Sequence, residues 1–210
     1  MAIAFGAISG RTSAQTGTSV AVSGSNTIGI ILTQGNVSAT NSITAITWGG
    51  VSMTLIDGAQ VPSDRYMSAW YVLNPSSSGA ISMTGGAFWD WYSWYYTGAL
   101  QSGQVDSTNH GTSSASTTIT VATTVVASNC WTVMCQADGV GNVTYSTNVG
   151  VMRLSSSPTS QAISDSNGTV GTGSQSTTLT RTGTSGHAGV NFSIAPFVVA
   201  TVNSSFFAFM

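Results

Sequence analysis

Few side chains in this sequence could do chemistry. The 210 residues include two histidines, His110 and His187, and all six acidic residues are aspartate. A serine hydrolase needs a serine beside a histidine that a carboxylate orients. Asp106 and His110 form the nearest such pair, but serine and threonine are so abundant around them that chance explains a nearby hydroxyl. Paired carboxylates for glycoside hydrolysis would have to be two aspartates, because glutamate is absent. We therefore predict no catalytic residues and a protein that is not an enzyme.

The two cysteines, Cys130 and Cys135, lie in one apolar run that predicts a buried strand. Five steps along a strand cover about 16 Å, whereas a disulfide needs Cα atoms within about 7 Å of each other. We therefore expect two free thiols in the core. The histidines are isolated and no Cys-x-x-Cys spacing occurs, so we predict no metal site and no cofactor.

The densest group of potential binding residues is an aromatic run at positions 88–96. As a strand it would carry large rings on both faces, because successive side chains alternate. Such a strand lies either in the centre of a sandwich or with one face against a partner. Exposed rings could instead stack on a sugar while Asp90 binds its hydroxyls, so core, subunit-contact and glycan roles all stay open. The candidate binding residues here are Trp89, Trp91, Tyr92, Trp94, Tyr95 and Tyr96.

The end of the sequence forms a second apolar group. Pro196 closes the preceding strand, and residues 197–210 are apolar to the terminus. A terminal run of this kind must be covered by something. It is either a last strand packed on its own domain or an arm that docks on a neighbouring subunit. Its candidate contact residues are Phe206, Phe207 and Phe209.

The composition indicates sheet and a surface with little charge. Charged residues make up 5% of the chain, against about 25% in an average soluble domain. Lysine and glutamate, which favour helices, are absent, while serine, threonine, asparagine and glutamine supply the polar surface. A formal net charge of −2 leaves little repulsion between copies, which suits a homo-oligomer. Four scattered arginines form no basic stripe, so we expect no nucleic-acid partner.

The sequence also suggests where the protein works. The first residues lack the basic and apolar regions of a signal peptide, and no stretch of 18 apolar residues predicts a membrane span. An extracellular type of composition without an export signal is explained if the protein leaves the cell by lysis, as a virion part does. On a capsid it would lie outside the shell, away from the genome.

Short alternating segments separated by turn residues predict an antiparallel, jelly-roll-like β-sandwich over residues 1–196, followed by the apolar extension 197–210. The clearest element is a hairpin in which Gly49 and Gly50 connect 43–48 to 51–56. The serine- and glycine-rich stretch 155–176 is expected to be an exposed loop region. Further strands are expected at 18–22, 27–33, 66–73, 80–84, 88–96, 118–126, 130–136, 149–154, 177–181 and 188–194.

An ordered set of short motifs runs through the chain. Its members are Met1-Ala2-Ile3-Ala4-Phe5, Ile46-Thr47-Trp48-Gly49-Gly50-Val51-Ser52-Met53-Thr54, Ala69-Trp70-Tyr71-Val72-Leu73-Asn74-Pro75, Gly103-Gln104-Val105-Asp106, Thr118-Ile119-Thr120-Val121, His187-Ala188-Gly189-Val190 and Ile194-Ala195-Pro196. In this order they resemble a recurrent β-sandwich family of phage and metagenomic sequences. The chain departs from the family in its aromatic run, where such sequences usually carry small residues, and in its apolar end.

The resemblance implies a virion surface component and transfers no catalytic residue. We expect a capsid decoration protein, of the cement or head-fibre type, that meets copies of itself and other virion proteins such as the major capsid protein. A glycan- or receptor-binding module of a phage tail or fibre is an alternative, and a cellular surface-layer or filament subunit is another. The expected location is the virion exterior, or otherwise the extracellular space.

Overall fold

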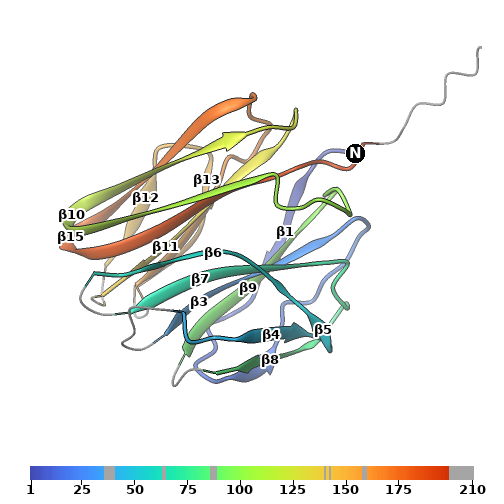
Figure 1. The fold of residues 1–210 in the computed structure, drawn as a ribbon, viewed down its shortest axis with the longest axis horizontal. Helices are drawn as coiled ribbons and strands as arrows, with labels where there is room; N and C mark the ends of the chain where they lie inside the picture. Colours follow the sequence, from blue (N-terminus) through green and yellow to red (C-terminus); the bar gives the residue numbers. More distant parts are fainter. Residues whose placement is uncertain are drawn as a thin grey trace, which may run out of the picture.

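The computed structural model in Figure 1 consists of strands joined by turns and loops. It describes residues 1–35, 41–62, 65–85, 89–139, 141, 143–157 and 160–198, and only the backbone of Trp89. Every strand pair in it is antiparallel. The predicted class, an antiparallel all-β sandwich, is confirmed. In the part of the chain described here, no helix is long and apolar enough to cross a membrane.

The strands form three sheets, which we call lower, middle and upper after their places in Figure 1. The lower sheet consists of β2 (Thr16–Thr18), β8 (Ala80–Thr84), β4 (Ala45–Trp48) and β5 (Val51–Ser52). The middle sheet has the order β1 (Ala4–Ile8), β9 (Trp89–Thr97), β3 (Ile28–Gly35), β7 (Tyr66–Leu73) and β6 (Thr54–Gln60). The upper sheet has the order β10 (Ser107–Val125), β15 (Gly173–Ile194), β11 (Trp131–Asp138), β14 (Gln161–Asp165) and β13 (Val151–Ser156), and β12 (Tyr145–Thr147) pairs with β15.

The middle sheet is covered on both faces, so its strands carry apolar residues at successive positions rather than at alternate ones. All eight residues of β3 are buried. Ile28 packs in a core shared with Val133 and Phe192 of the upper sheet. Ile31 points the other way, into a second core shared with Trp48 of the lower sheet. The chain is therefore a sandwich with two principal cores, one on each side of the middle sheet.

The hairpin predicted at Gly49 and Gly50 is present and joins β4 to β5. The two glycines have φ values of +59° and +83°, the positive values that a type I′ turn requires at both central positions. The predicted second strand, however, ends after Ser52. Met53 still donates to the lower sheet, at 2.8 Å from the carbonyl oxygen of Ile46, but the chain then crosses to the middle sheet as β6. The residues of the predicted strand 51–56 thus belong to two sheets, the lower and the middle.

β10 and β15 form a long two-stranded ribbon that doubles back on itself. The two strands pair over their whole lengths, with register shifts between Ser113 and Thr118. We call residues 107–113 and 187–194 the inner arm, residues 118–125 and 173–181 the outer arm, and the bend between them the crease. Figure 1 shows both arms meeting at the left edge of the molecule.

The outer arm lies over the inner arm. Asn191 Nδ2 donates to the carbonyl oxygen of Val121 at 2.8 Å, and Asn109 Nδ2 donates to that of Ala122 at 2.9 Å. These bonds join positions 70 and 13 residues apart, which is possible only because the ribbon folds over. A third, smaller apolar core fills the space between the outer arm and the rest of the upper sheet.

The predicted strand pattern is confirmed in most places, and three differences occur besides the one in the hairpin. Segments 66–73 and 80–84 are strands with the predicted bounds. The expected strand at 18–22 is instead Thr16–Thr18 followed by irregular chain. The expected loop 155–176 contains β14, which is buried at all five positions. The segments 177–181 and 188–194 belong to one strand, β15. The predicted extension 197–210 lies outside the described residues except for Phe197 and Val198.

Candidate functional site

The aromatic strand β9 is a core element rather than a surface. The exposed fraction is 0% for Trp91, Trp94 and Tyr96, 4% for Tyr92 and 6% for Tyr95. The interpretation of these five rings as an exposed contact or sugar-stacking surface is therefore corrected. β9 lies between β1 and β3 in the sheet that has a layer on each face, so both of its faces pack inside the chain.

On the upper side, the polar ends of the β9 rings reach across the core to the neighbouring sheet. The hydroxyl of Tyr96 donates to Asp165 Oδ2 at 3.0 Å, and Arg153 binds the same carboxylate through two nitrogens, at 2.8 and 3.0 Å. The hydroxyls of Tyr92 and Ser156 lie 2.7 Å apart. Burial, followed by the charge of Asp165, raises the pKa of Tyr96, so this phenol stays a hydrogen-bond donor.

On the lower side, the ring ends are satisfied by the irregular chain before β3. Trp91 Nε1 donates to the carbonyl oxygen of Ala14 at 2.8 Å, and the hydroxyls of Tyr95 and Ser23 lie 3.0 Å apart. Gly17 passes so close to Trp91 that an added Cβ would meet the ring at 2.7 Å. These polar groups are thus used within the chain.

Four predicted contact residues lie outside the description. The side chain of Trp89 is not described, and Phe206, Phe207 and Phe209 fall beyond Val198. Their roles in binding stay predictions.

Asp106 and His110, the nearest candidate pair in the sequence, have different partners in the structure. Asp106 accepts hydrogen bonds from the backbone amides of Val126 and Ala127, each at 2.9 Å. His110 Nδ1 instead lies 3.1 Å from Asp57 Oδ2, which joins β10 to β6 across two sheets. These positions are 53 residues apart, and no local signal in the sequence could have related them.

The pair of His110 and Asp57 lies at the surface, with side-chain exposures of 52% and 22%. Among the described residues no hydroxyl is hydrogen bonded to this imidazole, and that of Thr108 donates to Asp57 Oδ2 at 3.4 Å. A nucleophile must be in hydrogen-bond reach of the base that activates it. Among the residues with described positions, no group of three or more histidine, cysteine or acidic side chains could hold a metal ion.

The two cysteines are free and buried, as predicted. Burial, followed by the charge of Asp106, raises the pKa of Cys130 to about 12. Burial alone raises the pKa of Cys135. Both side chains are therefore neutral thiols at physiological pH, and neutral thiols are poor nucleophiles and poor metal ligands. They act as small apolar core residues.

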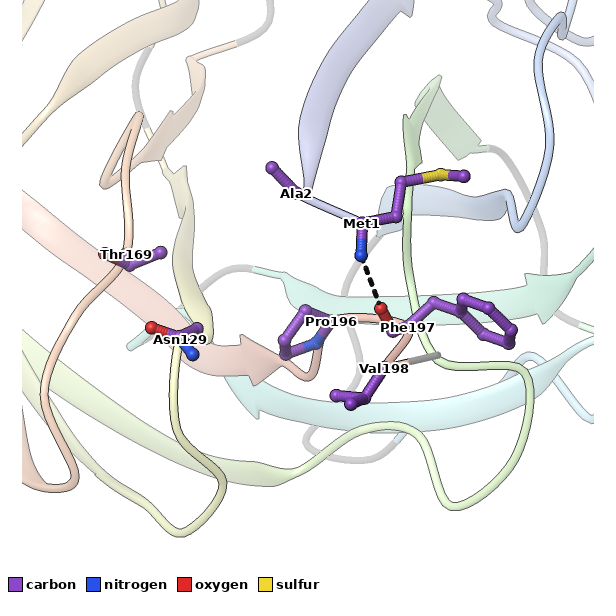
Figure 2. A pocket seen from close by; sticks show the side chains of 7 residues that line it. All are labelled: Met1, Ala2, Asn129, Thr169, Pro196, Phe197 and Val198. Carbon is purple, nitrogen blue, oxygen red and sulfur yellow. Dashed lines mark hydrogen bonds between the residues drawn. The ribbon is translucent and has the colours of Figure 1, made fainter. Parts of the chain in front are cut away.

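One surface feature is an apolar pocket where the two ends of the described chain meet, which we call the terminal pocket (Figure 2). Its volume is about 440 Å³. The amino group of Met1 donates to the carbonyl oxygen of Phe197 at 2.9 Å and so ties the ends together. The full lining is Met1, Ala2, Asn129, Thr169, Pro196, Phe197 and Val198. Most of these side chains are apolar, so the pocket suits an apolar occupant better than a charged one.

Most of the charge in the chain is neutralised by pairing. Arginine–aspartate ion pairs among the described residues include Arg11–Asp90 at 2.8 Å, Arg153–Asp165 at 2.8 Å and Arg181–Asp138 at 2.6 Å. The aspartates of these pairs have side-chain exposures of 10%, 0% and 0%. The exterior is therefore dominated by hydroxyl and amide groups, together with exposed apolar side chains such as Val126 and, in the terminal pocket, Val198.

Comparison of the chain with protein-family models, with curated proteins and with solved structures finds no significant match.

Proposed function

We propose that this protein is a structural component on the outside of a phage particle, a capsid decoration protein of the cement or head-fibre type. In this proposal it acts by binding to copies of itself and to other virion proteins. The ordered motifs that resemble a phage β-sandwich family support the virion setting. The terminal pocket is the single structural observation that carries the proposed mode of assembly.

The terminal pocket places apolar surface in contact with water. Val198 is 71% exposed and Met1 is 60% exposed, although both are large apolar residues. From Val198 the sequence continues for twelve more residues, which include three phenylalanines and no charged residue. Exposed apolar surface of this kind marks contact sites in soluble proteins. We propose that the end of one copy covers the terminal pocket of the next.

The rest of the exterior favours dense packing of copies. Surfaces with few charges repel one another weakly, and hydroxyl and amide groups can hydrogen bond across a contact without the cost of burying ions. A contact of this type is insensitive to salt, because screening acts only on charges. Association that persists in about 1 M salt is therefore expected, whereas an electrostatic contact would dissociate.

Two variants test the role of the pocket, because the chain offers a matched pair of exposed valines. Val198 lines the terminal pocket with 71% exposure, while Val126 is 70% exposed and does not line it. Val198→Asp puts a charge into the pocket and is expected to weaken self-association at least about tenfold, because an unpaired charge resists transfer from water. Val126→Asp carries the same change and should leave association unchanged. Equal effects of the two variants, or no effect of either, would contradict assembly through the pocket.

The location needs a separate experiment. Antibodies against this chain, applied to intact particles from the source that encodes it, should label the outside of the heads in negative-stain images. Labelling only after the particles are opened would contradict an exterior position. Labelling confined to tails would favour the fibre alternative.

A further inference from the structure

One buried carboxylate connects the outer arm of the ribbon to the sheet beneath it. Asp138 ends β11 in the upper sheet, and its side chain is fully buried. Arg181 Nη1 lies 2.6 Å from Asp138 Oδ2. The hydroxyl of Tyr145 donates to the same oxygen at 3.2 Å, and the hydroxyl of Ser185 donates to Oδ1 at 3.0 Å. These three partners belong to the outer arm, to β12, which pairs with it, and to the crease.

His187 lies beside this carboxylate, at the start of the inner arm. It pairs with Asp138 in the ladder between β15 and β11, and its exposed fraction is 0%. Its Nε2 lies 3.0 Å from the carbonyl oxygen of Thr118, the first residue of the outer arm. That distance fits a neutral imidazole in which Nε2 carries the proton and donates it. The charged groups that act on this ring are Asp138 from β11 and Arg181 from β15, and the titratable Tyr145 of β12 binds that aspartate.

Apart from these polar contacts, few apolar residues are buried between the outer arm and the rest of the upper sheet. Its core contains seven buried apolar residues, whereas the core between the middle and upper sheets contains twenty-one, counted over the described residues. Polar side chains also lie in this layer, among them Gln136 and Asn191, both at 0% exposure. Apolar burial alone therefore favours the closed position of the outer arm far less than it favours the contact between the two sheets.

The geometry of the crease allows the arm to move as a unit. Gly183 has a φ of +74°, and the register between β10 and β15 shifts on the other side of the bend. The pairing of 118–125 with 173–180 lies wholly inside the outer arm. A rotation at the crease would therefore keep this ladder and break only the contacts beneath it. Elements that open locally have few buried apolar contacts of this kind.

We infer that the outer arm, together with β12, can open separately from the rest of the fold. Asp138 and His187 hold it closed at the crease, and acid releases it. This inference is independent of the proposed virion role. Opening would expose Ile119, Val121 and Leu179, which makes the arm a cover over a latent apolar surface.

The sign of the acid effect follows from His187. Burial lowers its pKa below the ordinary value of 6.5, so the closed state binds the proton less readily than an open state in which the ring meets water. The closed state therefore has its full stability above pH 6.5 and loses it as the pH falls through that value towards the lowered pKa. One such group changes the ratio of open to closed molecules by up to about tenfold per pH unit in this range.

Amide hydrogen exchange, read by mass spectrometry on the full chain, tests this inference. After correction for the intrinsic pH dependence of exchange, protection of 118–125 and 173–181 should fall by up to about tenfold from pH 6.5 to 5.5, while β3 and β9 keep theirs. His187→Gln keeps a side-chain donor for Thr118 but cannot titrate, so it should remove this response. His110→Gln makes the same change at the exposed histidine of the inner arm and should preserve the response.

A second variant tests the carboxylate at neutral pH. Asp138→Asn removes the charge opposite Arg181 and should lower outer-arm protection about a hundredfold at pH 7.5, with β9 unchanged. Loss of protection in β9 together with the outer arm, in the native chain in acid, would show global unfolding and overturn the inference. An acid response that persists in His187→Gln would equally overturn it, and that measurement does not depend on whether Asp138→Asn folds.

Discussion

The two faces of the upper sheet are packed through different kinds of interaction. Its inner face meets the middle sheet through large rings, with Tyr96 edge-on to Trp131 at 6.0 Å between ring centroids, in a core of twenty-one buried residues. Its outer face meets the outer arm through a small apolar core and one ion pair, Asp138 with Arg181. The first contact is broad and non-directional, and the second is narrow and directional.

This difference separates stability from specificity. Burial of rings stabilises the stacked sheets over a wide range of pH and salt, although Tyr96 also donates to Asp165, which is paired with Arg153. The buried carboxylate contributes mainly by fixing where the outer arm lies, because any displacement leaves a charge unpaired in the interior. In this chain the aromatic residues stabilise the stacked sheets, and the pair of Asp138 and Arg181 fixes the position of the outer arm.

Removal of a ring from the core between the middle and upper sheets should have the largest effect on stability. Trp94→Ala deletes a side chain with 0% exposure from the principal core and is expected to lower the free energy of unfolding by about 5 kcal/mol. Urea denaturation followed by circular dichroism measures this. Trp94→Phe, which keeps most of the ring volume, should cost less than half as much. A loss below about 1 kcal/mol for the alanine variant would contradict the claim that ring burial stabilises the stacked sheets.

Removal of the carboxylate should come next. Asp138→Ala leaves Arg181 buried without its counter-charge and should lower the free energy of unfolding by about 3 kcal/mol. The double variant Asp138→Leu with Arg181→Met removes both charges and should recover most of that loss. Equal losses in the single and double variants would mean that the ion pair itself, rather than the unpaired charge, sets the stability.

The hydroxyl groups of β9 provide a comparison within one strand. Tyr96→Phe removes the donor to buried Asp165 and should cost about 1.5 kcal/mol. Tyr95→Phe, on the opposite face, removes a partly buried contact with Ser23 and should cost about 0.5 kcal/mol. Thermal unfolding of both variants at pH 7 gives the order, and the reverse order would show that the lower core depends more on its polar contacts.

The smallest effect is expected in the hairpin of the lower sheet. Gly50 has a φ of +83°, and nothing lies within 4 Å of the place where its Cβ would be. Gly50→Ala should therefore cost about 1 kcal/mol through backbone strain alone. Gly50→Asn should cost less, because asparagine tolerates positive φ. A clash would instead make asparagine the worse variant, which thermal unfolding would reveal.

The parts of the fold that the sequence predicted are those fixed by local chemistry. Two consecutive glycines determine the turn between β4 and β5, and a mostly apolar run ended by Asn74 and Pro75 predicts β7. β14 was missed because its polar residues, Gln161, Ser164 and Asp165, resemble a loop until a neighbouring sheet buries them. Local composition cannot show burial that distant strands provide.

The candidate site was predictable in its residue types but not in its location. The density of rings at 88–96 predicted a strand with large rings on both faces, but the sequence left open whether their contacts are internal. The lower sheet decides this question, because it covers the face of β9 that carries Trp91 and Tyr95. The pairs Asp138–Arg181 and Asp57–His110 join positions brought together only by the layered topology.

If the rings are internal, association between copies must depend on other surfaces, and the terminal pocket with residues 199–210 is the one proposed here. Sedimentation equilibrium of the intact chain and of residues 1–198, at matched concentrations in 1 M salt, tests this most directly. The account predicts an oligomer for the intact chain and a monomer with an unchanged unfolding temperature for the shorter one. The same molar mass for both chains would contradict it.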